Sequence, residues 1–285
     1  MNLKPFEYVE ATSLDDALKA LDAYGDEARI VAGGTVVVPL MKMRMVQPEA
    51  LVSLTRVEGL ADVRGDGERI TIGALATHRA VSTSPLVRDR LPLLAEACGR
   101  VASPVIRSMG TIGGNLCYGE SASDPPSAML VLGARVHVRG PEEERVVPVE
   151  DFFVGYYETA IGEGEILTHV EVPLQPEGAR WRYLKWTPRA REDKPLVGLA
   201  VLLDVEDGTC REARMAVGGV ADRPVLLAGA SAALSGATLD DAAIADAAEV
   251  AADEVDPVDD LQASAGYRRD MLRVWVRRVL DQLRA

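Results

Sequence analysis

Cysteine is scarce in this chain: only three occur in 285 residues, and no two of them form a C-x-x-C pair. Cys98, Cys117 and Cys210 are too few and too scattered to hold a four-cysteine iron–sulfur cluster or a cysteine-rich zinc site. We expect reduced thiols, which are typical of cytoplasmic proteins. Cys117 directly follows a glycine-rich segment, so both burial and contact with a ligand remain open for it.

Histidine is equally rare, and the familiar catalytic signatures are missing. His78, His137 and His169 do not share a metal-ligand spacing such as H-E-x-x-H. No G-x-S-x-G and no nucleophile beside an evident base is present. The sequence therefore predicts neither a metal site nor a catalytic acid, base or nucleophile. His137 and His169 fall in alternating segments typical of strands, where a structural role is the simpler interpretation.

Positive charge and long apolar runs are also lacking. The 31 lysines and arginines are outnumbered by 44 aspartates and glutamates, which gives a formal net charge of -13. A basic face is required to bind nucleic acid, so this balance argues against it. No apolar run approaches the roughly 20 residues that span a bilayer, and no export signal is visible at the N-terminus. We expect a cytoplasmic protein without a membrane span.

Two glycine-rich segments stand out instead. Neither Gly33-Gly34 nor Gly113-Gly114 belongs to a G-x-G-x-x-G or P-loop motif, but each lies beside a threonine. Glycine permits φ > 0 and leaves no side chain in the path of a ligand. Consecutive free N–H groups in such turns suit anions such as phosphate. One such turn indicates only a tight connection, whereas two favour a ligand gripped from both sides.

Hydrophobic patterning divides the chain into three α/β or α+β units, at residues 1–60, 61–175 and 176–285. Ser13 caps a predicted amphipathic helix in the first unit. The second contains a predicted helix over residues 92–103 and several alternating strands. The third begins with antiparallel strands joined at Glu206-Asp207-Gly208 and ends with two helices, over residues 240–252 and 263–284.

Several segments together resemble one family. They are, in order, VAGGTVVVPLMKMR, ITIGALATHRAV, RSMGTIGGNLCYGESASDPPSAML, GEILTHVEVP, GGVADRPV and SAGYRRDMLRVWVRRVL. The chain resembles the FAD-binding medium subunit of the molybdenum hydroxylases, the flavoprotein of the carbon monoxide dehydrogenase and xanthine dehydrogenase group. The resemblance implies an α+β fold, with a two-part FAD-binding domain of the vanillyl-alcohol-oxidase/PCMH type. A smaller α+β C-terminal domain with an antiparallel sheet and helices is expected to follow.

The same resemblance implies which residues hold FAD. Both glycine segments would bind the diphosphate, the first through backbone N–H groups and the positive charge of Arg29. Leu167 would touch the isoalloxazine through its backbone, Val101 would make an apolar contact, and His78 would lie near the flavin. The full set of expected FAD contacts is Arg29, Ile30, Val31, Ala32, Gly33, Gly34, Thr35, Val36, Val101, Thr111, Ile112, Gly113, Gly114, Asn115, Asp124, Leu167 and Lys185.

Three charged residues leave alternatives open. Asp124 accepts hydrogen bonds from ribityl or ribose hydroxyls, caps the helix that starts at the following prolines, or does both. Lys185 either stabilises the anionic reduced flavin or is an exposed strand lysine. Lys194 departs from the family, which often has an aromatic or large apolar residue there that can cover one flavin face. This departure leaves oxygen reactivity and the electron acceptor open.

Two functions follow from the resemblance. In the first, the chain is a subunit that takes electrons from an iron–sulfur small subunit and a molybdopterin large subunit and passes them to a small-molecule acceptor. In the second, it is a free-standing FAD-dependent oxidase or dehydrogenase acting on a small molecule. Lys194 and the acidic, alanine-rich segment after Thr238 are hints of such independence. A non-catalytic FAD-binding or assembly protein is a third alternative.

Overall fold

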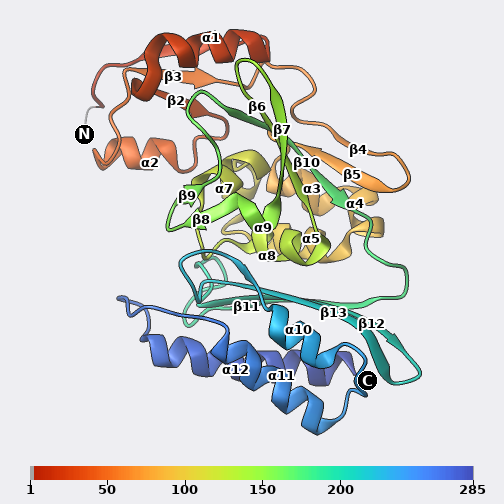
Figure 1. Cartoon of the computed structure of the whole chain (residues 1–285). Helices are drawn as coiled ribbons and strands as arrows, with labels where there is room; N and C mark the ends of the chain where they lie inside the picture. The colour runs from red at the N-terminus through yellow and green to blue at the C-terminus, as the bar shows by residue number, and fades with distance from the viewer. Residues whose placement is uncertain (1–2, 285) are drawn as a thin grey trace.

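The computed structural model describes residues 3–284, which form three main sheets stacked from the N-terminal to the C-terminal end of the molecule (Figure 1). Helices fill the space between the central and the C-terminal sheet and cover the outer face of the latter. No helix in residues 3–284 is both long and apolar enough to cross a membrane.

The N-terminal unit is a parallel sheet in the order β1-β3-β2. Its elements are β1 (Glu7–Glu10), α1 (Leu14–Tyr24), η1 (Gly25–Glu27), β2 (Ala28–Val31), α2 (Val37–Lys42) and β3 (Ala50–Ser53). The Ser13 hydroxyl accepts a hydrogen bond from the Asp16 N–H, as the capping pattern predicts. Pro39 is accommodated near the start of α2, where no intrahelical donor is lost.

The central sheet is antiparallel throughout, in the order β4-β5-β10-β6-β7. These strands are β4 (Val63–Gly65), β5 (Arg69–Gly73), β6 (Arg135–Arg139), β7 (Glu144–Pro148) and β10 (Ile166–Pro173). Alternate residues such as Ile70, Ile72, Val136 and Val138 are fully or almost fully buried in one core. This period of two lets one face pack while the other stays partly exposed.

Helices cover the buried face of the central sheet. They are α3 (His78–Thr83), α4 (Pro85–Arg90), α5 (Pro92–Arg100), α6 (Pro104–Met109), α7 (Ile112–Tyr118), α8 (Asp124–Leu132) and α9 (Val149–Phe152), followed by the hairpin of β8 (Phe153–Gly155) and β9 (Glu158–Thr159). The interpretation of Thr111–Asn115 as a turn was wrong, because these residues cap and begin α7. Two adjacent glycines disfavour a helix. Here the Thr111 hydroxyl accepts from the Gly114 N–H and stabilises its start.

The C-terminal sheet is also antiparallel, in the order β11-β12-β13-β14. Its strands are β11 (Arg180–Trp186), β12 (Val197–Glu206), β13 (Thr209–Gly218) and β14 (Val225–Leu226). The helices α10 (Ala228–Leu234), α11 (Asp241–Asp253) and α12 (Ala265–Leu283) follow. The predicted turn is confirmed, since Asp207 and Gly208 both have positive φ between β12 and β13. Both predicted helices are present; α10 was not predicted.

Strand β12 is buried on both faces, and this joins the C-terminal unit to the central one. Leu199, Val201 and Leu203 belong to the core formed with α10 to α12. Ala200 and Leu202 belong to the core beneath the central sheet. Helix α8 packs directly against β12 and β13. The C-terminal sheet therefore serves as a floor for the helices of the central unit.

Replacing Ile72 by alanine is expected to lower the free energy of unfolding by about 2–5 kcal/mol, because it opens a void in the central core. Thr71, the preceding residue on the other face of β5, is the matched control. Its replacement by alanine is expected to cost less than about 1 kcal/mol. Urea unfolding followed by circular dichroism measures both. Equal losses for the two variants would contradict the assigned faces of β5.

Candidate functional site

The two glycine segments meet in space although almost eighty residues separate them. A Cβ atom added to Gly33 would lie 1.8 Å from the carbonyl oxygen of Met109. One added to Gly110 would lie 3.5 Å from the Thr35 hydroxyl oxygen. The backbones of the two segments are thus in direct contact, and Gly33 has no room for any side chain. The juxtaposition predicted from the paired glycines is present.

A cavity of about 680 Å³ opens beside this contact. We call it the main cavity. All the expected FAD contacts line it except Val31 and Ile112, whose side chains pack in the protein core. The expected contacts that do line it are Arg29, Ile30, Ala32, Gly33, Gly34, Thr35, Val36, Val101, Thr111, Gly113, Gly114, Asn115, Asp124, Leu167 and Lys185. Segments from all three sheets therefore converge on one site.

The first glycine segment presents unsatisfied backbone donors. Within residues 3–284, no protein oxygen accepts a hydrogen bond from the N–H groups of residues 33–36. Gly34 has φ of +66°, which only glycine adopts without strain, and α2 begins directly afterwards. Arg29 lines the same cavity and is held by hydrogen bonds to the carbonyl oxygens of Asp26 and Ala28, at 2.7 and 2.6 Å. Free N–H groups and a cation form an anion site.

The second glycine segment works differently. The N–H groups of residues 112–115 all donate to oxygen atoms of the chain, at 2.8–3.1 Å. Gly113 is required for packing, since an added Cβ would lie 2.7 Å from the Ala74 Cβ. What this segment offers a ligand is side-chain chemistry from Thr111 and Asn115. We expected a ligand bound from both sides, but only the first glycine segment has backbone N–H groups free to bind it.

A buried ion pair closes the cavity on the side of the C-terminal sheet. The Lys185 ammonium of β11 donates to the Asp124 carboxylate and to the Arg100 carbonyl oxygen, both at 2.9 Å. The Tyr183 hydroxyl donates to the other Asp124 oxygen at 2.7 Å. Burial raises the pKa of Asp124, and Lys185 and Tyr183 oppose that shift.

This network excludes one alternative for each of its two charged residues. The side chains of Lys185 and Asp124 are each only 5% exposed, so Lys185 is not an exposed strand lysine. Asp124 begins α8, but its carboxylate binds Tyr183 and Lys185 instead of capping the helix. Contact of either residue with a ligand remains a prediction, and both line the main cavity.

His78 lines the main cavity, and one of its ring nitrogens is buried without a hydrogen-bond partner in residues 3–284. Its side chain is buried, and its Nδ1 has no hydrogen-bond partner within the described part of the chain. Burial, together with the positive charge of Arg107, lowers the pKa of His78 to about 4. The imidazole is therefore neutral near pH 7. A buried nitrogen without a hydrogen-bond partner is costly to stability.

Glu120, Tyr118 and Tyr157, which were not selected from the sequence, line another part of the cavity wall beside Lys194. Lys194 forms an ion pair with Glu120, whose carboxylate also accepts from the Tyr157 hydroxyl at 2.9 Å. Tyr157 comes from the β8–β9 turn, has φ of +54° and packs against Tyr118 with ring centroids 5.0 Å apart. Both tyrosines line the cavity. Aromatic side chains are thus supplied by segments other than the one that carries Lys194.

Cys117 also lines the main cavity and is exposed there, so contact with a ligand is the alternative that the structure favours for it. Cys98 and Cys210 are buried.

The remaining two histidines form a cluster on the outer face of the central sheet. His137 and His169 are cross-strand neighbours with ring centroids 4.0 Å apart, and Glu171 lies 3.2 Å from the His137 Nε2. Their proximity allows a metal, but the rings are stacked within 18° of parallel. The in-plane lone pairs of stacked imidazoles do not converge on one ion. Glu171 is also paired with Arg69 at 3.1 Å.

Comparison with known families covers both halves of the chain. Residues 4–175 match the FAD binding domain in molybdopterin dehydrogenase, and residues 182–283 match the CO dehydrogenase flavoprotein C-terminal domain. The chain is 37% identical to the 6-hydroxypseudooxynicotine dehydrogenase complex subunit alpha of Paenarthrobacter nicotinovorans, over 98% of this chain and 95% of that protein. It is 36% identical to the carbon monoxide dehydrogenase medium chain of Afipia carboxidovorans, over 98% and 97%.

Solved structures agree with the sequence comparison. The fold matches a chain of the reconstituted CO dehydrogenase from Oligotropha carboxidovorans with a TM-score of 0.96 and 35% identity, over 100% of this chain and 99% of that one. The predicted α+β fold, a FAD-binding region followed by a C-terminal domain, is confirmed. The chain therefore belongs to the family of FAD-binding medium subunits of the molybdenum hydroxylases, which are parts of oxidoreductase complexes.

Proposed function

We propose that the main cavity holds FAD, with its diphosphate on the first glycine segment. The observation that carries this assignment is that residues 33–36, whose N–H groups have no protein acceptor within residues 3–284, line the same cavity as Arg29. Thr111 and Asn115 complete the diphosphate site from the opposite segment. A cavity of about 680 Å³ lies in the usual range for cofactor sites.

The rest of the cavity suits a flavin ring. Val101, Leu167 and Leu75 provide apolar walls, and the neutral imidazole of His78 lines the same cavity. Bound FAD supplies the redox chemistry, which no side chain of the protein can perform. Lys185 places a positive charge in the wall, and a cation there favours the anionic reduced cofactor. Asp124 fixes the position of that cation.

We further propose that this chain takes electrons from an iron–sulfur small subunit and a molybdopterin large subunit and passes them to a small-molecule acceptor in the cytoplasm. The support is that one relative is named as a subunit of a dehydrogenase complex and another as a medium chain. We retain residues 1–60, 61–175 and 176–285 as the proposed structural units. Residues 33–36 and 111–115 then face each other across the boundary of the first two.

Lys194 and the acidic, alanine-rich segment after Thr238 no longer favour a free-standing enzyme. Lys194 has a structural partner in Glu120. The acidic, alanine-rich helix α11 packs between α10 and α12, with Ile244 and Ala248 in the C-terminal core. Both features are thus explained by the fold, and the family comparison favours a subunit of a complex.

A tagged copy of this chain, purified from its native host, is expected to bring down two further chains together with molybdenum, iron and FAD. Metal analysis and released-flavin absorbance measure these components. A control preparation with the tag on an unrelated cytoplasmic protein sets the background. Recovery of a lone flavoprotein that oxidises a small molecule without metals would favour the free-standing enzyme instead.

The replacement Gly33→Ala is expected to reduce FAD content at least tenfold. A methyl group there meets the Met109 carbonyl oxygen at 1.8 Å and must push the two segments apart. Gly99→Ala is the control, since its methyl group would lie an unstrained 3.8 Å from the Ser82 Cβ. Flavin content per folded chain, with circular dichroism to verify folding, is the measurement. Full flavin retention in a folded Gly33→Ala protein would contradict the proposed diphosphate site on the first glycine segment.

Stability is expected to depend on pH through His78. Because the folded-state pKa of about 4 lies below the ordinary 6.5, the unfolded chain binds the proton more readily. The contribution of the neutral His78 to the free energy of unfolding is therefore complete above pH 6.5 and is lost as pH falls toward 4. Between pH 7 and pH 5 the cofactor-free wild type should lose about 2 kcal/mol more than His78→Gln. Urea unfolding at both pH values measures this difference, and identical losses would contradict it.

A further inference from the structure

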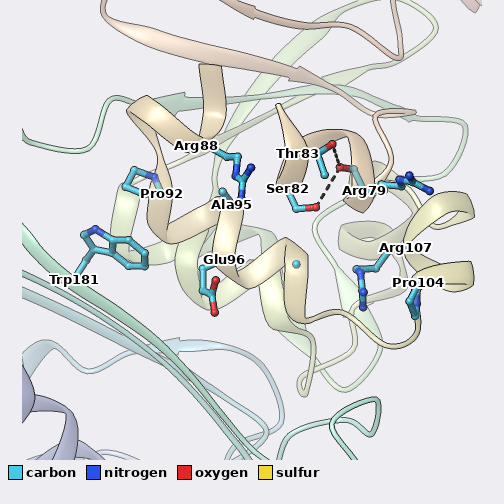
Figure 2. Close-up of a pocket in the computed structure, with 11 residues that line it drawn as sticks. Arg79, Ser82, Thr83, Arg88, Pro92, Ala95, Glu96, Pro104, Arg107 and Trp181 are labelled. Carbon is cyan, nitrogen blue, oxygen red and sulfur yellow. Dashed lines mark hydrogen bonds between the residues drawn. The ribbon is translucent and has the colours of Figure 1, made fainter. Parts of the chain in front are cut away.

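A second cavity, of about 600 Å³, lies outside the main cavity and shares no lining residue with it. Helices α3 to α6 form most of its wall, and Trp181 of β11 stands at one end (Figure 2). Arg107 and Pro104 lie at the other end, and Arg88 lies between them and Trp181. We call this space the second cavity.

The second cavity is positively charged in an otherwise acidic protein. Arg79, Arg88 and Arg107 line it, and within residues 3–284 none of the three forms an ion pair with a carboxylate. Among the described residues of its wall, Glu96 is the only acidic one, and it is paired with Arg100 at 2.6 Å. Three unneutralised guanidinium groups in a chain of net charge -13 create a local site for anions. Guanidinium groups bind phosphate oxygens with two parallel hydrogen bonds.

Arg107 connects the second cavity to the main cavity. It donates to the carbonyl oxygens of Val101 and Ala102, at 2.7 and 2.6 Å. Both of those residues line the main cavity, and Ala102 has a strained φ of +36°. Strain of this kind persists only where surrounding contacts hold it. The side chain that holds this bend is therefore also part of the wall of the second cavity.

We propose that the second cavity binds a nucleoside phosphate, with the phosphates on the arginines and the base against Trp181. Stacking of a base on an aromatic ring is favourable and tolerates any base. Phosphate oxygens near Arg107 compete with the Val101 and Ala102 carbonyl oxygens for its N–H groups. Binding is thereby communicated to the wall of the main cavity, beside the proposed flavin.

Calorimetric titration of the FAD-loaded full chain with ADP, at constant ionic strength, tests this site. Loading with FAD blocks the main cavity, which would otherwise take the ADP moiety. Saturable binding is expected, about tenfold or more weaker in Arg88→Gln, because one charge-assisted contact is lost. Arg90→Gln is the matched control, since Arg90 is exposed on the same helix and does not line the second cavity. It should bind ADP like the wild type.

Two further readouts examine the base and the link between the cavities. ADP should bind more tightly than pyrophosphate, and its addition should change the flavin fluorescence. The proposal is overturned if ADP shows no saturable heat or if Arg88→Gln binds it as tightly as wild type. Equal affinities for ADP and pyrophosphate overturn the role of Trp181, and unchanged fluorescence overturns the link. FAD content is measured separately, so failure here is distinct from failure of the proposed flavin site.

Discussion

Contact between two backbones at Gly33 and Met109 is the constraint on which the site depends. Because there is no space for a Cβ at Gly33, the first segment can lie directly against the end of α6. This contact brings residues 33–36, whose N–H groups have no protein acceptor within residues 3–284, to the same cavity as Thr111 and Asn115. A side chain at position 33 would separate the N-terminal sheet from the central unit. The same absence of a side chain thus shapes both the interface and the cavity.

A second long-range contact adds the C-terminal sheet to this arrangement. The buried Lys185 reaches from β11 to Asp124 on α8 and to the last residue of α5. Removing one partner of such a pair leaves an uncompensated buried charge, which is strongly destabilising. Strand β12 packs into a core on each of its faces, and its pairing with β11 fixes the position of β11. The C-terminal unit therefore does more than cover the core, since it contributes a cation to the main cavity.

Much of this arrangement could be predicted from the sequence, for physical reasons that differ by residue. Gly33 and Gly34 are informative because glycine is selected where backbones approach closely or φ is positive. Helices and strands with clear periodicity, such as α1 and β10, were evident. Helix α7 was missed because its stability comes from the Thr111 cap and the packing of Gly113, not from propensity.

Other parts of the site depend on contacts between distant segments, which no local pattern reveals. Neither Glu120 nor Tyr157 was selected from the sequence, and they meet Lys194 only because three loops converge. The second cavity also depends on contacts between segments, since its arginines come from three short helices.

Charge placement explains how an acidic protein can hold two sites for anions. The surplus of carboxylates is spread over the chain, whereas Arg29 lies at one cavity and Arg79 and Arg88 at the other. Arg107 lies between the two: its charge adds to the burial that lowers the pKa of His78, and its N–H groups hold the strained bend at Ala102. One guanidinium thus holds the shape of the wall and contributes to the neutral state of its histidine. An anion that draws Arg107 away acts on the bend at Ala102, whereas burial still lowers the pKa of His78.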